Sequence, residues 1–305
     1  MHYATDHVVM IRPKHFGFNP ETAANNTFQQ DSGALTAQEI SAKAIAEFDG
    51  FVRILRDHGV QVDVIEDSDT PVKPDAIFPN NWFSTEADGT LITYPMFSPA
   101  RRTERRGDVI AGLSAKFRVS RHYSFEVYEE QDRFLEGTGS LVLDRVHRIA
   151  YACISERTDM ILVEKFCIVR DYTPVTFHAV YGGKPVYHTN VVMALGASCV
   201  VICMECIADE QERTRLKEAF ERTGKEILGI TSEQMAAFAG NMLELQTEEG
   251  GLWVMSEQAY KSLRQDQLSR LTRDHKVIFA PMYTIEQYGG GSARCMIAEN
   301  FLERL

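Results

Sequence analysis

A motif that recurs at near-regular intervals restricts the fold of this chain more than any other sequence feature. Five segments share a polar or glycine-rich loop that leads into a short apolar strand: FPNNWFST, FLEGTGSLVLD, YHTNVVMALG, FAGNMLELQ and GGGSARCMIAE. Anchored on Asn81, Gly139, Asn190, Asn241 and Cys295, they lie 58, 51, 51 and 54 residues apart. Such loops are common in α/β proteins, so coincidence is the alternative, but the regular spacing favours a repeated supersecondary unit.

After four of the anchors, the sequence predicts a second strand followed by a helix. The first two strand pairs turn at Asp88-Gly89 and near Asp144, where polar residues interrupt the apolar runs. One helix should end at Gly224, since glycine favours the position after a helix. Apolar periodicity predicts helices over residues 105–117, 159–170, 209–224 and 256–271.

The N-terminal segment supplies the elements that the last module lacks. An apolar strand at 7–13 precedes a long helix, which begins at the capping box formed by Thr36 and Glu39. Gly59 ends this helix, and the alternating segment 60–66 predicts another strand. One face of the helix carries Ile40, Ala44, Phe48, Val52 and Leu55. We therefore expect one α/β domain over 1–305, a closed five-fold pseudosymmetric propeller of strand-strand-helix-strand modules around a central site.

Composition limits the partners of the protein. A net charge of −11 disfavours nucleic acid and anionic membranes, because both require a basic surface. The N-terminus has no basic start followed by an apolar run, so we expect a soluble, cytoplasmic protein. Five of the six cysteines, including the Cys203 and Cys206 pair, are expected to pack as small hydrophobic residues.

In a ring, the equivalent loops converge, so their polar residues should become neighbours. A thiol, an imidazole and a carboxylate on the converging loops are the components of a cysteine-nucleophile site. Each residue alone has an ordinary structural reading, such as an Asx-turn or a buried histidine. The loops offer Asn80, Asn81, Glu136, His188, Asn190, Asn241, Arg294 and Cys295.

The chemistry of such a site follows from the thiolate. Arg294, a protonated His188 or backbone N–H groups could stabilise the ionised Cys295. Its target would be an electrophilic carbon flanked by nitrogen. His188 would protonate the departing amine and then activate water, as a general acid and base.

Five motifs together resemble the guanidino-group-modifying superfamily of pentein fold: PDAIFPNNWFS, MFSPARRTERRG, EGTGS, YHTNVVMALG and GGGSARCM. This superfamily includes arginine deiminases, dimethylarginine dimethylaminohydrolases and arginine:glycine amidinotransferases. The resemblance spans nearly the whole chain. It implies that Cys295 is the nucleophile, His188 the acid and base, and Glu136 the carboxylate that supports the histidine or binds the substrate nitrogen.

The resemblance also implies a substrate-binding set. Asp75 matches an aspartate of the first motif, and Arg101 or Arg102 matches an arginine that binds the substrate α-carboxylate. Alternatively, Asp75 is a turn residue and the arginines begin a solvated helix. Asn81 and Asn190 replace aspartates of the family, and Asn80 and Arg294 are further candidates for contact with the substrate.

These two amides change the expected substrate. A guanidinium favours paired carboxylates, whereas an amide offers both a donor and an acceptor to a neutral ureido group. The chain therefore resembles the citrulline-utilisation branch, which implies hydrolysis of citrulline or a related compound to ornithine, ammonia and carbon dioxide through a covalent thiouronium- or thiocarbamoyl-type intermediate.

Other functions stay open. A guanidino substrate could undergo deimination, demethylamination or amidino transfer, and a non-catalytic binding protein on the same fold is a second alternative. No metal-binding histidine cluster or nucleotide motif is present, so we expect no metal and no cofactor. The partner would be a small amino acid such as citrulline or arginine, and a homo-oligomer is possible on this sequence. The polar segment 15–30 is interpreted as a long loop or a lid over the site.

Overall fold

The computed structural model describes residues 3–305 as an α/β fold. Within these residues, five three-stranded sheets share one order, in which the middle strand pairs antiparallel on one side and parallel on the other. Four of them are continuous in sequence: β3 (Phe83–Thr85), β4 (Thr90–Thr93) and β5 (Arg121–Ser124); β6 (Val142–Asp144), β7 (Ile149–Cys153) and β8 (Thr173–Phe177); β11 (Met193–Leu195), β12 (Cys199–Ile202) and β13 (Glu226–Gly229); β14 (Leu243–Thr247), β15 (Gly250–Ser256) and β16 (His275–Ala280).

The fifth sheet joins segments from opposite ends of the chain. Strand β1 (His7–Arg12) pairs antiparallel with β17 (Ala298–Glu299) and parallel with β2 (Gln61–Glu66). The expectation that the N-terminal segment completes the last module is therefore confirmed. A separate hairpin is formed by β9 (Val180–Tyr181) and β10 (Lys184–Pro185).

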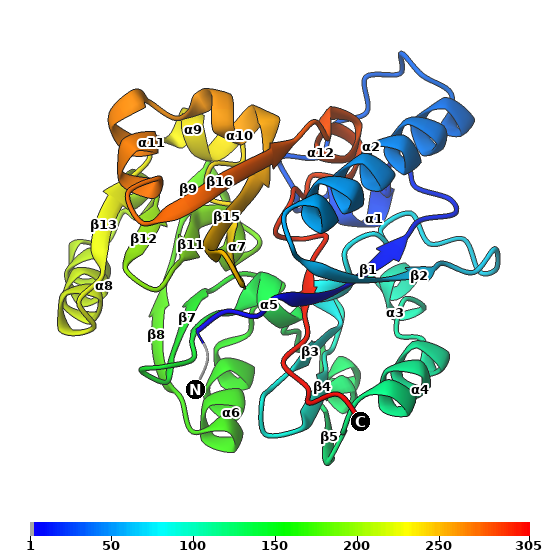
Figure 1. The fold of residues 1–305 in the computed structure, drawn as a ribbon, viewed down its shortest axis with the longest axis horizontal. Coiled ribbons are helices and arrows are strands. Elements are labelled where there is room, and N and C mark those ends of the chain that lie inside the picture. Colours follow the sequence, from blue (N-terminus) through cyan, green and yellow to red (C-terminus); the bar gives the residue numbers. More distant parts are fainter. Residues whose placement is uncertain (1–2) are drawn as a thin grey trace.

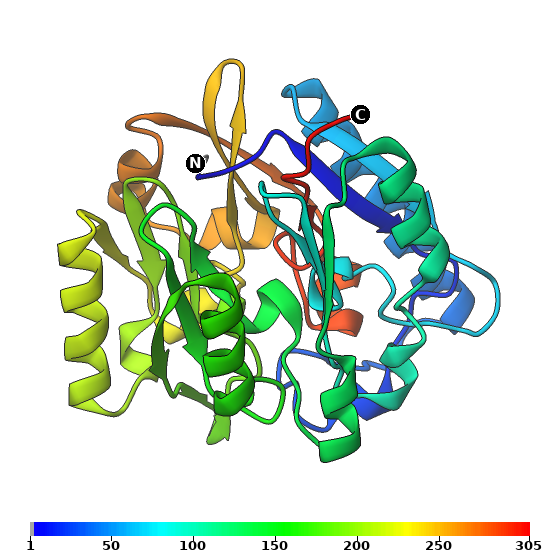
Figure 2. The same cartoon turned by 90° about the horizontal axis from the view of Figure 1, so that it is seen from below.

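Helices connect the parallel strands and lie around the periphery of the molecule, outside the sheets (Figure 1). Figure 2 shows the same arrangement from below, with the C-terminal segment in red near the middle. The connecting helices are α2 (Ala37–Asp57), α4 (Gly107–Lys116), α6 (Met160–Arg170), α8 (Glu210–Arg222), α10 (Glu257–Ser262) and α11 (Gln265–Leu271). No helix within residues 3–305 is both long enough and apolar enough to cross a membrane.

Local sequence signals fix the ends of these helices. Both bonds of the predicted capping box are present at the start of α2, where Thr36 is the N-cap, and all five predicted apolar residues of its inner face are buried. Gly224, with φ +68°, follows α8 as predicted. The expected single helix over 256–271 was wrong. Leu263 and Arg264 are extended, with ψ of 138° and 159°, so that α10 ends and α11 begins with its own cap.

Short helical turns precede β3, β6 and β11 and contain three of the five anchors of the repeat, Asn81, Gly139 and Asn190. They were not predicted, because a single turn is too short for periodicity to reveal. The remaining helices are α1 (Pro20–Ala23), η1 (Pro79–Asn81), α3 (Pro99–Arg102), η2 (Glu126–Gln131), α5 (Gly137–Ser140), α7 (Thr189–Val192), η3 (Met204–Cys206), α9 (Ser232–Ala236) and α12 (Tyr283–Gly289).

Candidate active site

The glycine run before Cys295 allows close packing around the thiol. Gly290 ends α12 in the left-handed region, with φ +63°. A Cβ atom on Gly291 would lie 2.9 Å from the Phe78 ring and 3.3 Å from the Cβ atom of Cys295. Cys295 itself is 3% exposed. Position 291 therefore needs glycine, because the Phe78 ring and Cys295 occupy the space that a side chain would fill.

Two asparagine amides contact the thiol sulfur. The Nδ2 atoms of Asn190 and Asn241 lie 3.3 Å and 3.2 Å from Cys295 Sγ. Asn241 Nδ2 also donates to the backbone carbonyl of Asn190 at 2.8 Å. The repeat thus brings three of its five anchors, 105 residues apart at the extremes, into direct contact.

His188 and Glu136 form a buried pair. His188 Nε2 lies 2.8 Å from Glu136 Oε2, and the other carboxylate oxygen accepts the Phe97 backbone N–H at 2.9 Å. Burial opposes ionisation of Glu136, but the Arg157 guanidinium and the imidazole N–H outweigh it and lower its pKa to about 2. Burial lowers the pKa of His188 to about 4, although the carboxylate favours its protonation. At neutral pH an ionised carboxylate therefore holds a neutral imidazole with its proton on Nε2, which leaves Nδ1 as the basic nitrogen.

Gly139 makes room for this imidazole. A Cβ atom at this position would lie 2.7 Å from His188 Nδ1 and 2.5 Å from Asn81 Nδ2. Both distances are far shorter than a carbon atom tolerates. The anchor glycine of the second module is therefore required by the approach of two site residues to its backbone.

Arg101 lies at the centre of a buried charge network. Its guanidinium donates two bonds of 2.9 Å to the carboxylate of Glu104 and one of 2.9 Å to Asn81 Oδ1, and it lies 3.8 Å from Asp75. Burial raises the pKa of Glu104 to about 7 and also raises that of Asp75, against the opposing field of Arg101. Glu104 was not singled out from the sequence, where the RRTERR run is typical of an exposed helix.

Arg157 is a site residue that sequence reasoning missed. Its Nε donates to Asn25 Oδ1 and its Nη2 to the Thr22 carbonyl, both at 2.9 Å, while Nη1 lies 3.8 Å from Glu136 Oε2. The guanidinium also lies over the Tyr187 ring, 4.9 Å from its centroid. Its hydrogen-bond partners are neutral, and the charge that it faces is the Glu136 carboxylate. A lone arginine in SERTD gives no signal of burial.

The cavity at the thiol is small, with a volume of about 20 Å³. Asn26 and Thr22, from the segment 15–30, line it, and Asn26 Nδ2 donates to the Gly290 carbonyl at 3.4 Å. This segment therefore packs on the loop that leads to Cys295. The cavity is lined by Thr22, Asn26, Asp75, Phe78, Asn81, Arg101, Arg157, Tyr187, His188, Gly289, Gly291 and Cys295.

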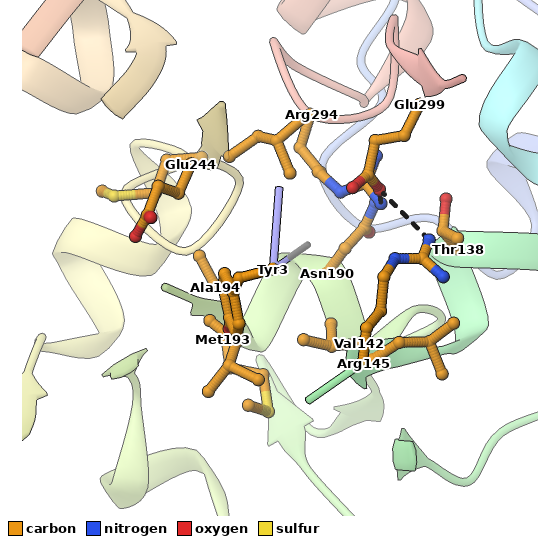
Figure 3. A pocket seen from close by; sticks show the side chains of 14 residues that line it. Tyr3, Thr138, Val142, Arg145, Asn190, Met193, Ala194, Glu244, Arg294 and Glu299 are labelled. Carbon is orange, nitrogen blue, oxygen red and sulfur yellow. Dashed lines mark hydrogen bonds and ion pairs between the residues drawn. The ribbon is translucent and has the colours of Figure 1, made fainter. Parts of the chain in front are cut away.

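Two predicted arginines lie outside this cavity. Arg102 is partly exposed and donates to the Met96 carbonyl at 3.1 Å, so of the adjacent pair only Arg101 lines the cavity. Arg294 binds Glu299 at 2.9 Å and lines a second cavity. Figure 3 shows this second cavity, where Arg294 and Arg145 lie on either side of Glu299.

Several buried polar atoms around the thiol have no hydrogen-bond partner within residues 3–305. Asn80, fully buried, has none on either side-chain atom. Buried polar groups without hydrogen-bond partners reduce the stability of the folded protein unless a ligand or a water molecule bonds to them. The other unpartnered atoms of the predicted set are Asp75 Oδ1, Asn81 Nδ2, Asn190 Oδ1 and Asn241 Oδ1. Among the described residues, no three His, Cys, Asp or Glu side chains converge as a metal site.

A family model and several solved structures match this chain. A family model described as N,N dimethylarginine dimethylhydrolase, eukaryotic, matches residues 12–302. A search of curated protein sequences found no match.

Solved structures share the fold at low sequence identity. ArgZ, an arginine dihydrolase from the ornithine-ammonia cycle in cyanobacteria, matches with a TM-score of 0.76 at 15% identity, over 96% of this chain and 40% of ArgZ. Unliganded AgrE gives 0.72 at 18% identity, over 96% and 39%. A dimethylarginine dimethylaminohydrolase bound to S-methyl-L-thiocitrulline gives 0.65 at 14% identity, over 97% and 100%. This chain therefore spans about two fifths of ArgZ and AgrE.

Proposed function

Since this chain belongs to the N,N dimethylarginine dimethylhydrolase family, pentein-superfamily hydrolases of C–N bonds in guanidino compounds, we propose that it hydrolyses the ureido group of citrulline or a close relative. The products would be ornithine, ammonia and carbon dioxide. We also infer that the five sheets close as a five-fold propeller in a single domain over 1–305. The shared strand order and the pairing of β17 with β1 support that inference.

The observation that carries the proposed substrate is the orientation of the Asn81 amide. Its Oδ1 accepts from Arg101, which has only donors, so Nδ2 is fixed as a donor without a partner beside the cavity. A guanidinium has no acceptor to meet this donor. A ureido carbonyl does, and its nitrogen atoms can donate to the unpartnered Oδ1 of Asp75.

The proposed reaction proceeds through a thiocarbamoyl intermediate. His188 takes the proton of the Cys295 thiol as sulfur attacks the ureido carbon, and then gives that proton to the amine that leaves when the C–N bond breaks. Water, deprotonated by His188, attacks the same carbon and releases the thiolate. The carbamic acid formed separates into an amine and carbon dioxide, so that one water is consumed for each citrulline.

Three other groups are assigned to the amino-acid end of the substrate, to Asn81 and to the histidine. Arg157 lines the cavity with neutral hydrogen-bond partners, which suits it to an α-carboxylate. Arg101 is already bound to Glu104 and is assigned to holding Asn81 in orientation. Glu136 keeps His188 in the tautomer with a basic Nδ1.

A guanidino substrate is the second candidate, and Asp75 favours it. Its unpartnered Oδ1 lines the cavity and would accept a cationic guanidinium. The relatives act on or bind such compounds: ArgZ is described as an arginine dihydrolase, and AgrE was solved with L-arginine. Deimination, demethylamination, dihydrolysis and amidino transfer all belong to this candidate.

Product analysis separates the candidates. Purified protein is incubated separately with citrulline, arginine and dimethylarginine, and ornithine, citrulline and ammonia are quantified. Cys295→Ser should abolish all product, whereas the control Cys167→Ser, on α6, should not. Ornithine from citrulline supports the proposal, and citrulline from arginine with no further reaction refutes the ureido substrate.

Replacing the two amides with carboxylates tests whether they set the preference between citrulline and arginine. Asn81→Asp combined with Asn190→Asp should lower the ratio of kcat/KM for citrulline to that for arginine by at least about tenfold, since each removes a neutral donor and adds an anion. An unchanged ratio would show that these positions do not select the substrate.

A further inference from the structure

The charged groups that could stabilise an ionised Cys295 are engaged elsewhere. Of those that line its cavity, Arg101 binds Glu104 and lies 3.8 Å from Asp75, and Arg157 pairs with Glu136 at 3.8 Å. Arg294 donates to Glu299 and to the Ile297 carbonyl, both at 2.9 Å, and lines the second cavity. His188 is bound to Glu136 and is neutral at physiological pH. Within residues 3–305, the side-chain hydrogen bonds to Cys295 Sγ come from the amides of Asn190 and Asn241.

The orientation of the Asn241 amide is fixed by its second bond. Nδ2 donates one hydrogen to the Asn190 carbonyl at 2.8 Å, and a carbonyl can only accept. The other hydrogen is directed at Sγ, at 3.2 Å. The Arg294 backbone N–H approaches the Asn241 carbonyl at 3.4 Å, which ties this turn to the nucleophile loop.

A strained turn places Asn241 against the sulfur. Phe238 adopts φ +63°, a conformation that is unfavourable for an aromatic residue, and its carbonyl accepts the Asn241 N–H at 2.8 Å. A Cβ atom on Gly240 would lie 2.2 Å from the Val191 carbonyl oxygen, so the turn packs directly on α7. Strain of this kind persists where the surrounding structure holds it, and such sites are concentrated at functional centres.

We infer that Asn241 is a positioning residue that, with Asn190, stabilises the Cys295 thiolate through two amide N–H bonds. The thiolate accepts both bonds, whereas a neutral thiol accepts them weakly. The amides therefore favour ionisation without a permanent positive charge beside the sulfur, and they fix the direction in which it meets the substrate. The inference rests on the proposed function only in taking Cys295 as the nucleophile.

The test is the pH dependence of Cys295 alkylation by iodoacetamide, followed by mass spectrometry with the Cys295→Ser protein as the blank. Asn241→Leu removes the donors at similar volume and should move the midpoint of the alkylation curve upward by about one pH unit, so that alkylation at pH 7 is about tenfold slower. Met242→Leu, a volume-conserving change in the next residue, is the matched control and should leave the midpoint in place.

Asn241→Asp provides a second variant of the same shape in case the leucine variant does not fold. Its carboxylate opposes a thiolate, so the midpoint should move upward at least as far. A midpoint equal to that of wild type in either folded variant overturns the inference. Alkylation needs no substrate, so a failure to hydrolyse citrulline would not affect this result.

Discussion

Replacing Glu136 with glutamine tests how the site keeps its histidine basic. The two carboxylate oxygens accept from two different donors, His188 Nε2 at 2.8 Å and the Phe97 backbone N–H at 2.9 Å. Glutamine has one acceptor oxygen and one NH₂ group, so it cannot accept from both. If NH₂ faces the imidazole, the tautomer reverses and Nδ1 is no longer a base. If NH₂ faces Phe97, the backbone N–H has no acceptor.

The magnitude follows from these bonds. A hydrogen bond to a charged group contributes roughly 1.5–3 kcal/mol, and a loss of about 2 kcal/mol in the transition state lowers kcat/KM about 30-fold. Glu136→Gln should therefore lower kcat/KM for the best substrate by about 10- to 100-fold at pH 7, with most of the loss in kcat. Steady-state kinetics of ornithine or citrulline formation measure it.

Glu129 offers a matched control from the same region. Its carboxylate accepts the Met96 backbone N–H at 2.7 Å and pairs with Arg105, and within residues 3–305 it bonds to no histidine. Glu129→Gln should lower the melting temperature about as much as Glu136→Gln does, but it should change kcat far less. If Glu136→Gln retains kcat within threefold of wild type, the carboxylate does not control the imidazole and the reasoning is refuted.

Three further predictions follow from the same contacts. Gly139→Ala should lower kcat at least tenfold because its Cβ enters the space of the imidazole, whereas Gly112→Ala, in open space on α4, should keep full activity. Arg157→Gln should raise KM about tenfold or more with a smaller change in kcat, and Arg102→Gln should leave KM within twofold, as initial-rate kinetics would show. The free energy of unfolding should fall as pH decreases from about 6.5 towards 4, because the pKa of His188 is lowered to about 4 in the folded protein and the unfolded chain binds the proton first. Urea titrations at stepped pH measure this slope, which His188→Gln should reduce.

The sequence predicted the contacts that depend on the spacing of the repeat. Cys295, His188 and Glu136 lie in loops that the repeat makes equivalent. His188 bonds to Glu136 at 2.8 Å and lines the same cavity as Cys295, as the spacing predicts. The same spacing identified Asn241 as an anchor, but its contact with sulfur depends on a turn whose strain at Phe238 has no sequence signature.

Side-chain direction and burial were not predictable in the same way. Arg101 and Arg102 are adjacent, and the rotation between successive helical residues places one in the cavity and the other near the surface. Arg294 and its neighbour Cys295 lie on different cavities: Cys295 lines the cavity at the thiol, and Arg294 lines the second cavity. Arg157 bonds to Thr22 and Asn25 of the segment 15–30, a long-range contact that no local pattern encodes.

The pairing of β1 with β17 sets the order in which the protein can mature during synthesis. Domains fold as the ribosome releases them from the N-terminus, at roughly 5–20 residues per second. Strand β1 is released before the other strands of the five sheets, yet its antiparallel partner lies at Ala298–Glu299, just after Cys295. The nascent chain therefore carries an incomplete sheet until that partner is released. The sheet that contains β1 is the first to begin and the last to be completed, and a chain that stops before Ala298 leaves one edge of β1 without its antiparallel partner.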